Sequence, residues 1–417
     1  MHLYELPLIF VLIGLVLYTV LAGADFGAGF WQLFAGRGQG GVRVRDHAHE
    51  SMAPVWEANH VWLIFVLTVT WTAYPTAFGS IASTLSVPLF IAAIGIILRG
   101  AAYALRAGTS SHREQRSIDA VFAVSSILTP FALGTMVGAI ASRRVPVGNA
   151  AGHMFSSWLN PTSILVGVLA VATSAYLAAV FLAADAARGS DSELERGFRA
   201  RALGAGIVAG AVALAGIAVL HGDAHPLYHR LLQGDALAAM IVSILAGILT
   251  LGLVLRSRFE TARYTAAAAV AAVIAAWALA QNPLLLPGLT VRQAAAPHDT
   301  LVVVTVAVLG GAVILFPSLG LLFRLVLHGR LDHDAEIAAP PLPVAPALLS
   351  ASSSGLLARA AGACLLAGFG FLTIAEAGWA HAVGVLALFG FMVCGLLAAT
   401  PSQLVEGDDR AVDSRDR

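Results

Sequence analysis

The chain has 417 residues, of which 58% are hydrophobic and only 12% charged. Soluble domains carry roughly 25% charged residues, so this composition cannot cover a water-facing surface and predicts a membrane protein. The formal net charge is zero, which gives no support for nucleic-acid binding through a basic surface. All 24 basic residues are arginines, and this excludes chemistry that needs a lysine. Cys364 and Cys394 both lie in apolar runs, which favours neither a disulfide framework nor a zinc site.

Eleven apolar stretches are long enough to be transmembrane helices, since a span needs roughly 20 mostly apolar residues. Short arginine-bearing loops separate them, which favours helices over a β-barrel. We therefore expect an all-α polytopic membrane protein of antiparallel helix bundles, with about nine core spans and a C-terminal helical hairpin. The stretches are 7–33, 55–78, 84–105, 118–141, 161–184, 202–221, 236–255, 264–281, 300–325, 356–374 and 380–399.

The first predicted span carries an acidic residue, Asp25, within the sequence GADFGAGF at 23–30. Asp25 lies eight residues before the end of this span, roughly 12 Å deep at 1.5 Å per residue. Intramembrane acids are costly and usually have a partner or a water-filled cavity. The surrounding glycines let another helix approach closely. We interpret Asp25 as a functional residue; the alternative is a polar residue that only stabilises helix packing.

The second predicted span begins with PVWEANHVWLIF at 54–65. Glu57 lies near the start of this span, at a depth comparable to that of Asp25, because consecutive spans are antiparallel. His60 follows three residues later, on the same helix face. Two carboxyls and a histidine near one membrane face are suited to proton uptake. In the alternative interpretation, Glu57 favours the helix N-terminus and Trp56 anchors the interface.

The boundary between the second and third stretches is less well defined than the others. We expect a tight turn near Gly79 to Thr84. Alternatively, 55–78 and 84–105 form one broken, re-entrant unit.

A later loop is rich in histidine, with His221, His225 and His229 in nine residues. These residue types can bind a metal ion, but a surface loop of this kind is more often only solvated, and spacing alone does not define a site. We predict no metal site in the chain.

The C-terminal quarter is organised differently. A Pro/Ser-rich linker is expected at 331–355, followed by the additional transmembrane hairpin at 356–400. Residues 401–417 are polar and charged, which predicts a disordered tail.

The distribution of arginine predicts the orientation. With the N-terminus outside and the C-terminus in the cytoplasm, only Arg143, Arg144, Arg230 and Arg292 of the 24 arginines fall on the outer side. Arg99 is counted with the arginines that flank inner loops. The positive-inside rule therefore favours this orientation with an odd number of spans.

The motifs at 23–30 and 54–65, followed by WTAYP at 71–75, resemble subunit II of cytochrome bd-type quinol oxidases. The resemblance in span layout covers residues 1–330, and beyond about residue 110 it rests on hydropathy and short pieces such as LNP at 159–161. Within these motifs Asp25 matches the family's acidic residue on helix 1, and Trp56 and Glu57 match its Trp–acid pair.

The resemblance implies a multi-pass protein of the bacterial cell (inner) membrane, paired with a haem-bearing oxidase subunit I. The complex would oxidise quinol and reduce oxygen to water, with haem b and haem d on subunit I; the resemblance assigns no cofactor to this chain and leaves open whether a haem or a structural quinone also binds here. Membrane lipid and a small accessory subunit are further expected partners. The chain would support subunit I and contribute a cytoplasmic proton path through Asp25 and Glu57, with His60 beside it and Trp56 near a cofactor.

Three features depart from the family pattern. Glu57 stands where some members have Asp, His60 stands where others have Gln, and the hairpin at 356–400 has no counterpart. The alternative function is a proton-coupled transporter that works alone, but such folds place their site near the membrane midplane.

Overall fold

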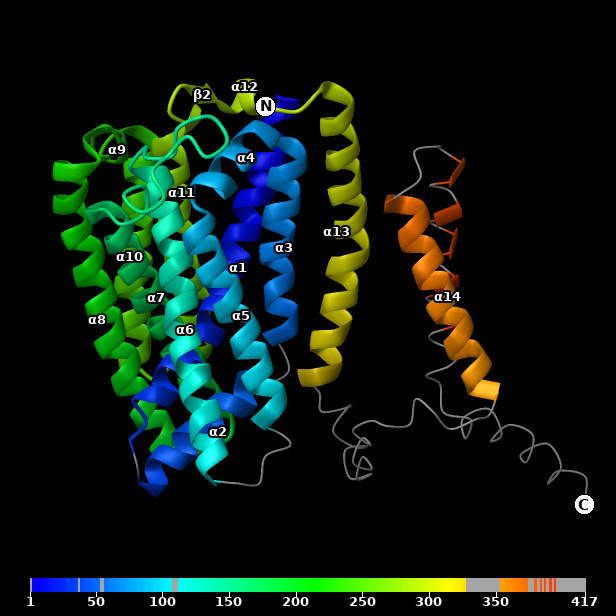
Figure 1. Ribbon diagram of the computed structural model, residues 1–417. Coiled ribbons are helices and arrows are strands. Elements are labelled where there is room, and N and C mark those ends of the chain that lie inside the picture. The colour runs from blue at the N-terminus through cyan, green and yellow to red at the C-terminus, as the bar shows by residue number, and fades with distance from the viewer. Residues whose placement is uncertain are drawn as a thin grey trace, which may run out of the picture. The chain divides into compact units, whose positions relative to one another are not determined.

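The computed structural model describes residues 2–36, 38–52, 56–106, 112–327 and 353–373, with scattered positions between 379 and 394. The side chains of 56–58 are not among the described ones. The chain divides into two units, Met1–Ser318 and Leu319–Arg417. Eight described helices are long and apolar enough to cross a membrane. The expected all-α, multi-pass membrane fold is thereby confirmed (Figure 1).

The first unit contains two groups of four antiparallel helices. The first group consists of α1 (Leu6–Leu33), α3 (Trp56–Ala73), α5 (Ser86–Arg106) and α6 (His112–Ala141). The second consists of α7 (Pro161–Arg188), α8 (Ser192–Asp223), α10 (Gly234–Leu255) and α11 (Phe259–Gln281). Contacts of α7 with α1 and α6 join the two groups.

Shorter elements lie at the two ends of these bundles (Figure 1). The amphipathic helix α2 (Gln39–Met52) is at one end, which we call the α2 end. The opposite end, with the N-terminus, we call the N-terminal end. It carries η1 (Leu3–Glu5), α4 (Pro75–Thr84), α9 (His225–Leu231), β1 (Leu284–Leu286), β2 (Leu289–Thr290) and α12 (Val291–Ala294). The two strands form an antiparallel pair.

The expected span 55–78 is shorter in the structure, because α3 ends at Ala73. Its apolar part among the described residues is Asn59–Ala73. Pro75 then begins a separate helix, α4, so the tight turn expected near Gly79 to Thr84 is wrong: those residues are helical. Proline suits a first helical turn, where its missing N–H is not needed, and this explains the break. The hydroxyl of Tyr74 donates to the carbonyl of Tyr4 at 2.7 Å and fixes the corner between the helices.

Helix α13 (His298–Leu327) corresponds to the predicted stretch 300–325. Helix α14 (Ser353–Thr373) corresponds to the first half of the predicted hairpin and begins inside the stretch expected as a linker. Most of that linker and all of the tail at 401–417 lie outside the described residues. The hairpin and linker assignments therefore stay predictions.

Candidate functional site

Asp25 lies where glycines bring α1 unusually close to its neighbours. A Cβ on Gly27 would lie 1.9 Å from the backbone oxygen of Ser174 on α7, and a Cβ on Gly29 would lie 2.1 Å from Oγ of Ser126 on α6. Only glycine permits these approaches, as expected where small residues mediate helix contacts in a membrane. The result is that the Asp25 side chain is 1% exposed.

The partner of Asp25 is Arg99 on α5, whose side chain is 2% exposed. The guanidinium donates from Nη2 to Oδ1 of Asp25 at 2.5 Å and from Nε to Oδ2 at 3.2 Å. Nη2 also donates to the backbone oxygen of Asp25 at 2.8 Å. This paired, two-point geometry is the strong form of an arginine–carboxylate contact. Because the pair is neutral overall, the bundle buries no net charge here.

The third nitrogen of the guanidinium also has a partner, and two aromatic rings lie close to the group. Its Nη1 donates to the hydroxyl of Ser126, and that hydroxyl donates to the carbonyl of Phe122 at 2.5 Å. The Phe122 ring lies 4.1 Å from Cζ of Arg99, and the Phe26 ring lies 5.3 Å from it. Aromatic faces attract a cation, and more so where water is excluded. We call Asp25, Arg99, Ser126 and these two rings the buried pair site.

His60 on α3 borders this site. Its ring centroid lies 5.9 Å from that of Phe26 and 6.1 Å from that of Tyr18. The neighbouring residue Asn59 donates from Nδ2 to the carbonyl of Leu21 at 3.3 Å, which ties α3 to α1 at this level. The structure thus brings Asp25 and His60 into one region. The side chains of Glu57 and Trp56 lie outside the described residues, so their relation to the site is still a prediction.

Arg99 is the residue that sequence reasoning missed. It was expected to flank an inner loop, but it lies inside the bundle, so that expectation is wrong. The reason is electrostatic: a buried carboxylate needs a counter-charge, and Arg99 supplies it from a parallel helix. One signal was present in the sequence, because Asp25 and Arg99 lie eight and seven residues before the ends of α1 and α5.

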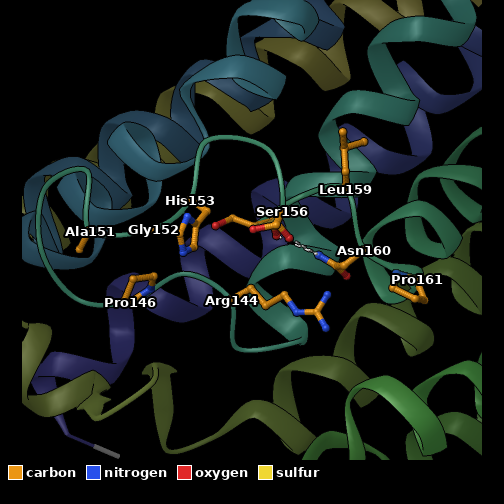
Figure 2. Close-up of a pocket in the computed structure, with 10 residues that line it drawn as sticks. Arg144, Pro146, Ala151, Gly152, His153, Ser156, Leu159, Asn160 and Pro161 are labelled. Carbon is orange, nitrogen blue, oxygen red and sulfur yellow. Dashed lines mark hydrogen bonds between the residues drawn. The ribbon is translucent and has the colours of Figure 1, made fainter.

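A surface pocket of the structure lies away from this site. It has a volume of about 530 Å³ and lies in the loop before α7, where Arg144, His153 and Asn160 line it (Figure 2). Arg144 already has a partner, because Nη2 donates to Oδ1 of Asp223 at 2.6 Å. Asp223 also accepts from the hydroxyl of Thr162 at 2.6 Å. These contacts anchor the loop to α7 and α8.

Comparisons with known proteins agree with this architecture. Residues 3–326 match the family described as cytochrome bd terminal oxidase subunit II. Cytochrome bd ubiquinol oxidase subunit 2 of Bacillus subtilis is 29% identical over 169 residues, 40% of this chain and 48% of that protein. Cytochrome bd-I ubiquinol oxidase subunit 2 of Escherichia coli is 25% identical over 173 residues, 39% of this chain and 44% of that protein. These alignments span about half the length of the two relatives.

The fold is also similar to that of a chain in the bd oxidase structure from Geobacillus thermodenitrificans. The TM-score is 0.66 at 24% identity, and the match covers 79% of this chain and 99% of that chain. The family match extends over most of the chain, including both helix bundles and the buried pair site. The chain therefore belongs to the cytochrome bd terminal oxidase subunit II family.

Proposed function

We propose that this chain is the second subunit of a bd-type terminal oxidase that couples quinol oxidation to the reduction of oxygen to water. Its role there is to support a haem-bearing subunit I and to contribute a cytoplasmic proton-uptake path through Asp25 and Glu57. The observation that carries the proton-path proposal is the fully buried Asp25 carboxylate, held inside the membrane-spanning bundle. Family membership argues against the alternative of a transporter that works alone.

Oxygen reduction to water consumes protons, and a redox site inside a membrane needs polar groups to deliver them. Asp25 lies roughly 12 Å from the α2 end of α1, counting 1.5 Å per residue. Arg99, itself held by Ser126, fixes the orientation of the Asp25 carboxylate, and the carboxylate is the acceptor for a proton that enters from that end. Bound haems supply the electron transfer and oxygen chemistry, while this chain supplies position and protons.

The haems b and d belong to subunit I in this proposal. Both ring nitrogens of His60 are buried within this chain, which supports placing the haems on subunit I. Its place beside Phe26 suits a role next to the proton path. The arginine distribution supports an outer N-terminus in the bacterial cell (inner) membrane, which would place the α2 end in the cytoplasm.

The test compares oxidase complexes by haem content and by quinol-dependent oxygen uptake per haem d. Removing Asp25 alone would leave Arg99 buried without its counter-charge, so the informative variant is the double change Asp25→Asn with Arg99→Gln. This variant and Glu57→Gln should keep the haems while turnover falls at least tenfold. Asp25→Glu should retain more activity, because it keeps the carboxyl.

A matched control is Asp299→Asn, since the Asp299 carboxyl is fully exposed at the start of α13. Its turnover should equal that of the wild type. If the double variant and Glu57→Gln both kept full turnover per assembled complex, the proton path would be wrong and the pair would be architectural. If complexes of the wild type contained no haem-bearing partner, the oxidase proposal itself would be wrong.

A further inference from the structure

Three histidines meet at the corner between α8 and α9, at the N-terminal end of the first unit. His221 lies in the last turn of α8, and His225 and His229 lie one turn apart on α9. The Nε2 atoms of His225 and His229 approach to 2.9 Å, with the two ring planes nearly perpendicular at 88°. Two imidazole nitrogens thus converge on one point at an exposed surface.

The tautomer of the neutral His225 ring follows from its backbone contact. Its Nδ1 lies 3.0 Å from the carbonyl oxygen of His221. A carbonyl oxygen can only accept, so Nδ1 carries the hydrogen, and in the neutral ring Nε2 then keeps a lone pair. Histidines that bind metal ions are held in the same way, with the second ring nitrogen donating to a carbonyl or carboxylate. His225 is therefore pre-oriented with its Nε2 lone pair toward His229, where it accepts the Nε2 hydrogen of that ring.

We propose that His225 and His229 form a two-histidine site for a divalent transition-metal ion, with Cu(II) bound most tightly. Imidazole nitrogens lie about 2.0–2.1 Å from such a metal, and two that meet it at a right angle are about 2.9 Å apart. Right-angled N,O coordination is typical of Cu(II) and Ni(II), and Cu(II) has the highest affinity in the divalent series. To bind the ion, His229 moves its ring hydrogen from Nε2 to Nδ1, which keeps the ring neutral.

The charged neighbours leave this site open. The Asp223 carboxylate is held by Arg144 and Thr162. The Arg230 guanidinium donates to the carbonyl of Asn282 at 2.6 Å. Among the described residues no cluster of three His, Cys, Asp or Glu side chains could hold a metal ion, so water completes the coordination. The site rests only on contacts within the α8–α9 corner and is independent of the proposed oxidase function.

The experiment titrates Cu(II) into the purified, chelator-treated complex and counts bound ions by equilibrium dialysis. Electron paramagnetic resonance reads out nitrogen ligation. The wild type should bind one more equivalent of Cu(II) than either His225→Gln or His229→Gln, with nitrogen couplings that both variants lack. The control His153→Gln removes another exposed histidine at the same end and should bind as the wild type does.

Equal Cu(II) binding by the wild type and both glutamine variants would overturn the site. Competition by Mg²⁺ as effective as that by Ni²⁺ would overturn it too, because an imidazole pair does not favour Mg²⁺, whose usual ligands are oxygens.

Discussion

Two arginine–carboxylate clusters in this protein have shortest contacts of similar length and opposite surroundings. In the buried pair site, Arg99 contacts Asp25 at 2.5 Å, with side chains that are 2% and 1% exposed. At the α2 end, Arg43 contacts Asp191 at the same distance, with side chains that are 45% and 30% exposed. Arg99 binds both carboxylate oxygens of Asp25, whereas Arg43 is shared between Asp191 and Glu193. The larger difference between the two clusters is burial, and it should determine how much each contributes.

The physical difference is whether water can solvate each charge once its partner is lost. If Arg43 loses Asp191, Glu193 and water still stabilise the guanidinium and water solvates the carboxylate, and exposed pairs contribute about 0–1 kcal/mol. If Arg99 loses Asp25, a full charge is left in the bundle without a counter-ion. Breaking a buried pair by removing one partner costs roughly 3–5 kcal/mol. The three predictions below test this contrast, from the largest expected effect to the smallest.

The largest effect should come from Arg99→Gln, which leaves the buried Asp25 without its partner. We expect a loss of roughly 3–5 kcal/mol in the free energy of unfolding and a sharp fall in the yield of complex. The loss of stability is measured by heating the complex in detergent and monitoring the folded fraction by fluorescence-detected size-exclusion chromatography. The same chromatogram of the unheated sample gives the yield.

The matched variant replaces both members by apolar residues of similar size, Asp25→Leu with Arg99→Met. Such replacements of a whole buried pair are often neutral for stability, so the yield should recover while turnover stays low. A double variant as unstable as the single one would show that packing, and not unpaired charge, sets the cost.

A smaller effect is expected from Gly27→Ala, which tests the close helix approach that buries the pair. The new Cβ would lie 1.9 Å from the backbone oxygen of Ser174, so α1 and α7 must separate. Overpacking of this kind costs typically about 1–3 kcal/mol.

The control for this change is Gly204→Ala on α8, where a new Cβ meets nothing within 4 Å. Alanine favours a helix over glycine by roughly 1 kcal/mol, so this variant should be as stable as the wild type or more stable. Equal thermal stabilities for the two alanine variants would contradict the close-packing argument.

The smallest effect should come from Arg43→Ala at the surface, with a shift in melting temperature of about 1–2 °C at most. The backbone hydrogen bond from Leu194, followed by the contact with Arg43, lowers the pKa of Asp191 below its ordinary value of 3.8. Because the folded state lowers this pKa, the stabilisation is present above 3.8 and is lost as the pH falls below it.

Melting curves at pH 7 and near pH 3, with and without high salt, check this prediction. High salt should reduce the contribution of Arg43, since exposed pairs are screened, whereas the effect of Arg99→Gln should persist. If salt reduced both effects equally, the two pairs would lie in similar surroundings and the comparison would fail.

Much of this protein could be predicted from its sequence. Long apolar stretches predicted the helices, because a hydrocarbon core allows only structures that satisfy their own backbone hydrogen bonds. The motifs around Asp25 and Glu57 predicted the family, and the family match over 3–326 confirms it. Asp25 was identified as the informative intramembrane acid. Burying an ionisable group at that depth costs free energy, so such a group usually has a partner or a function.

The tertiary structure alone decided what surrounds Asp25. Arg99 is 74 residues away in the sequence, and its position near the end of an apolar stretch looks the same for a loop flank as for a buried counter-ion. Ser126 and Phe122 come from a third helix, so no local pattern could have placed them on the guanidinium. Sequence periodicity determines which residues form a helix, but the identity of a buried charge's partner depends on which helices pack together and in which register.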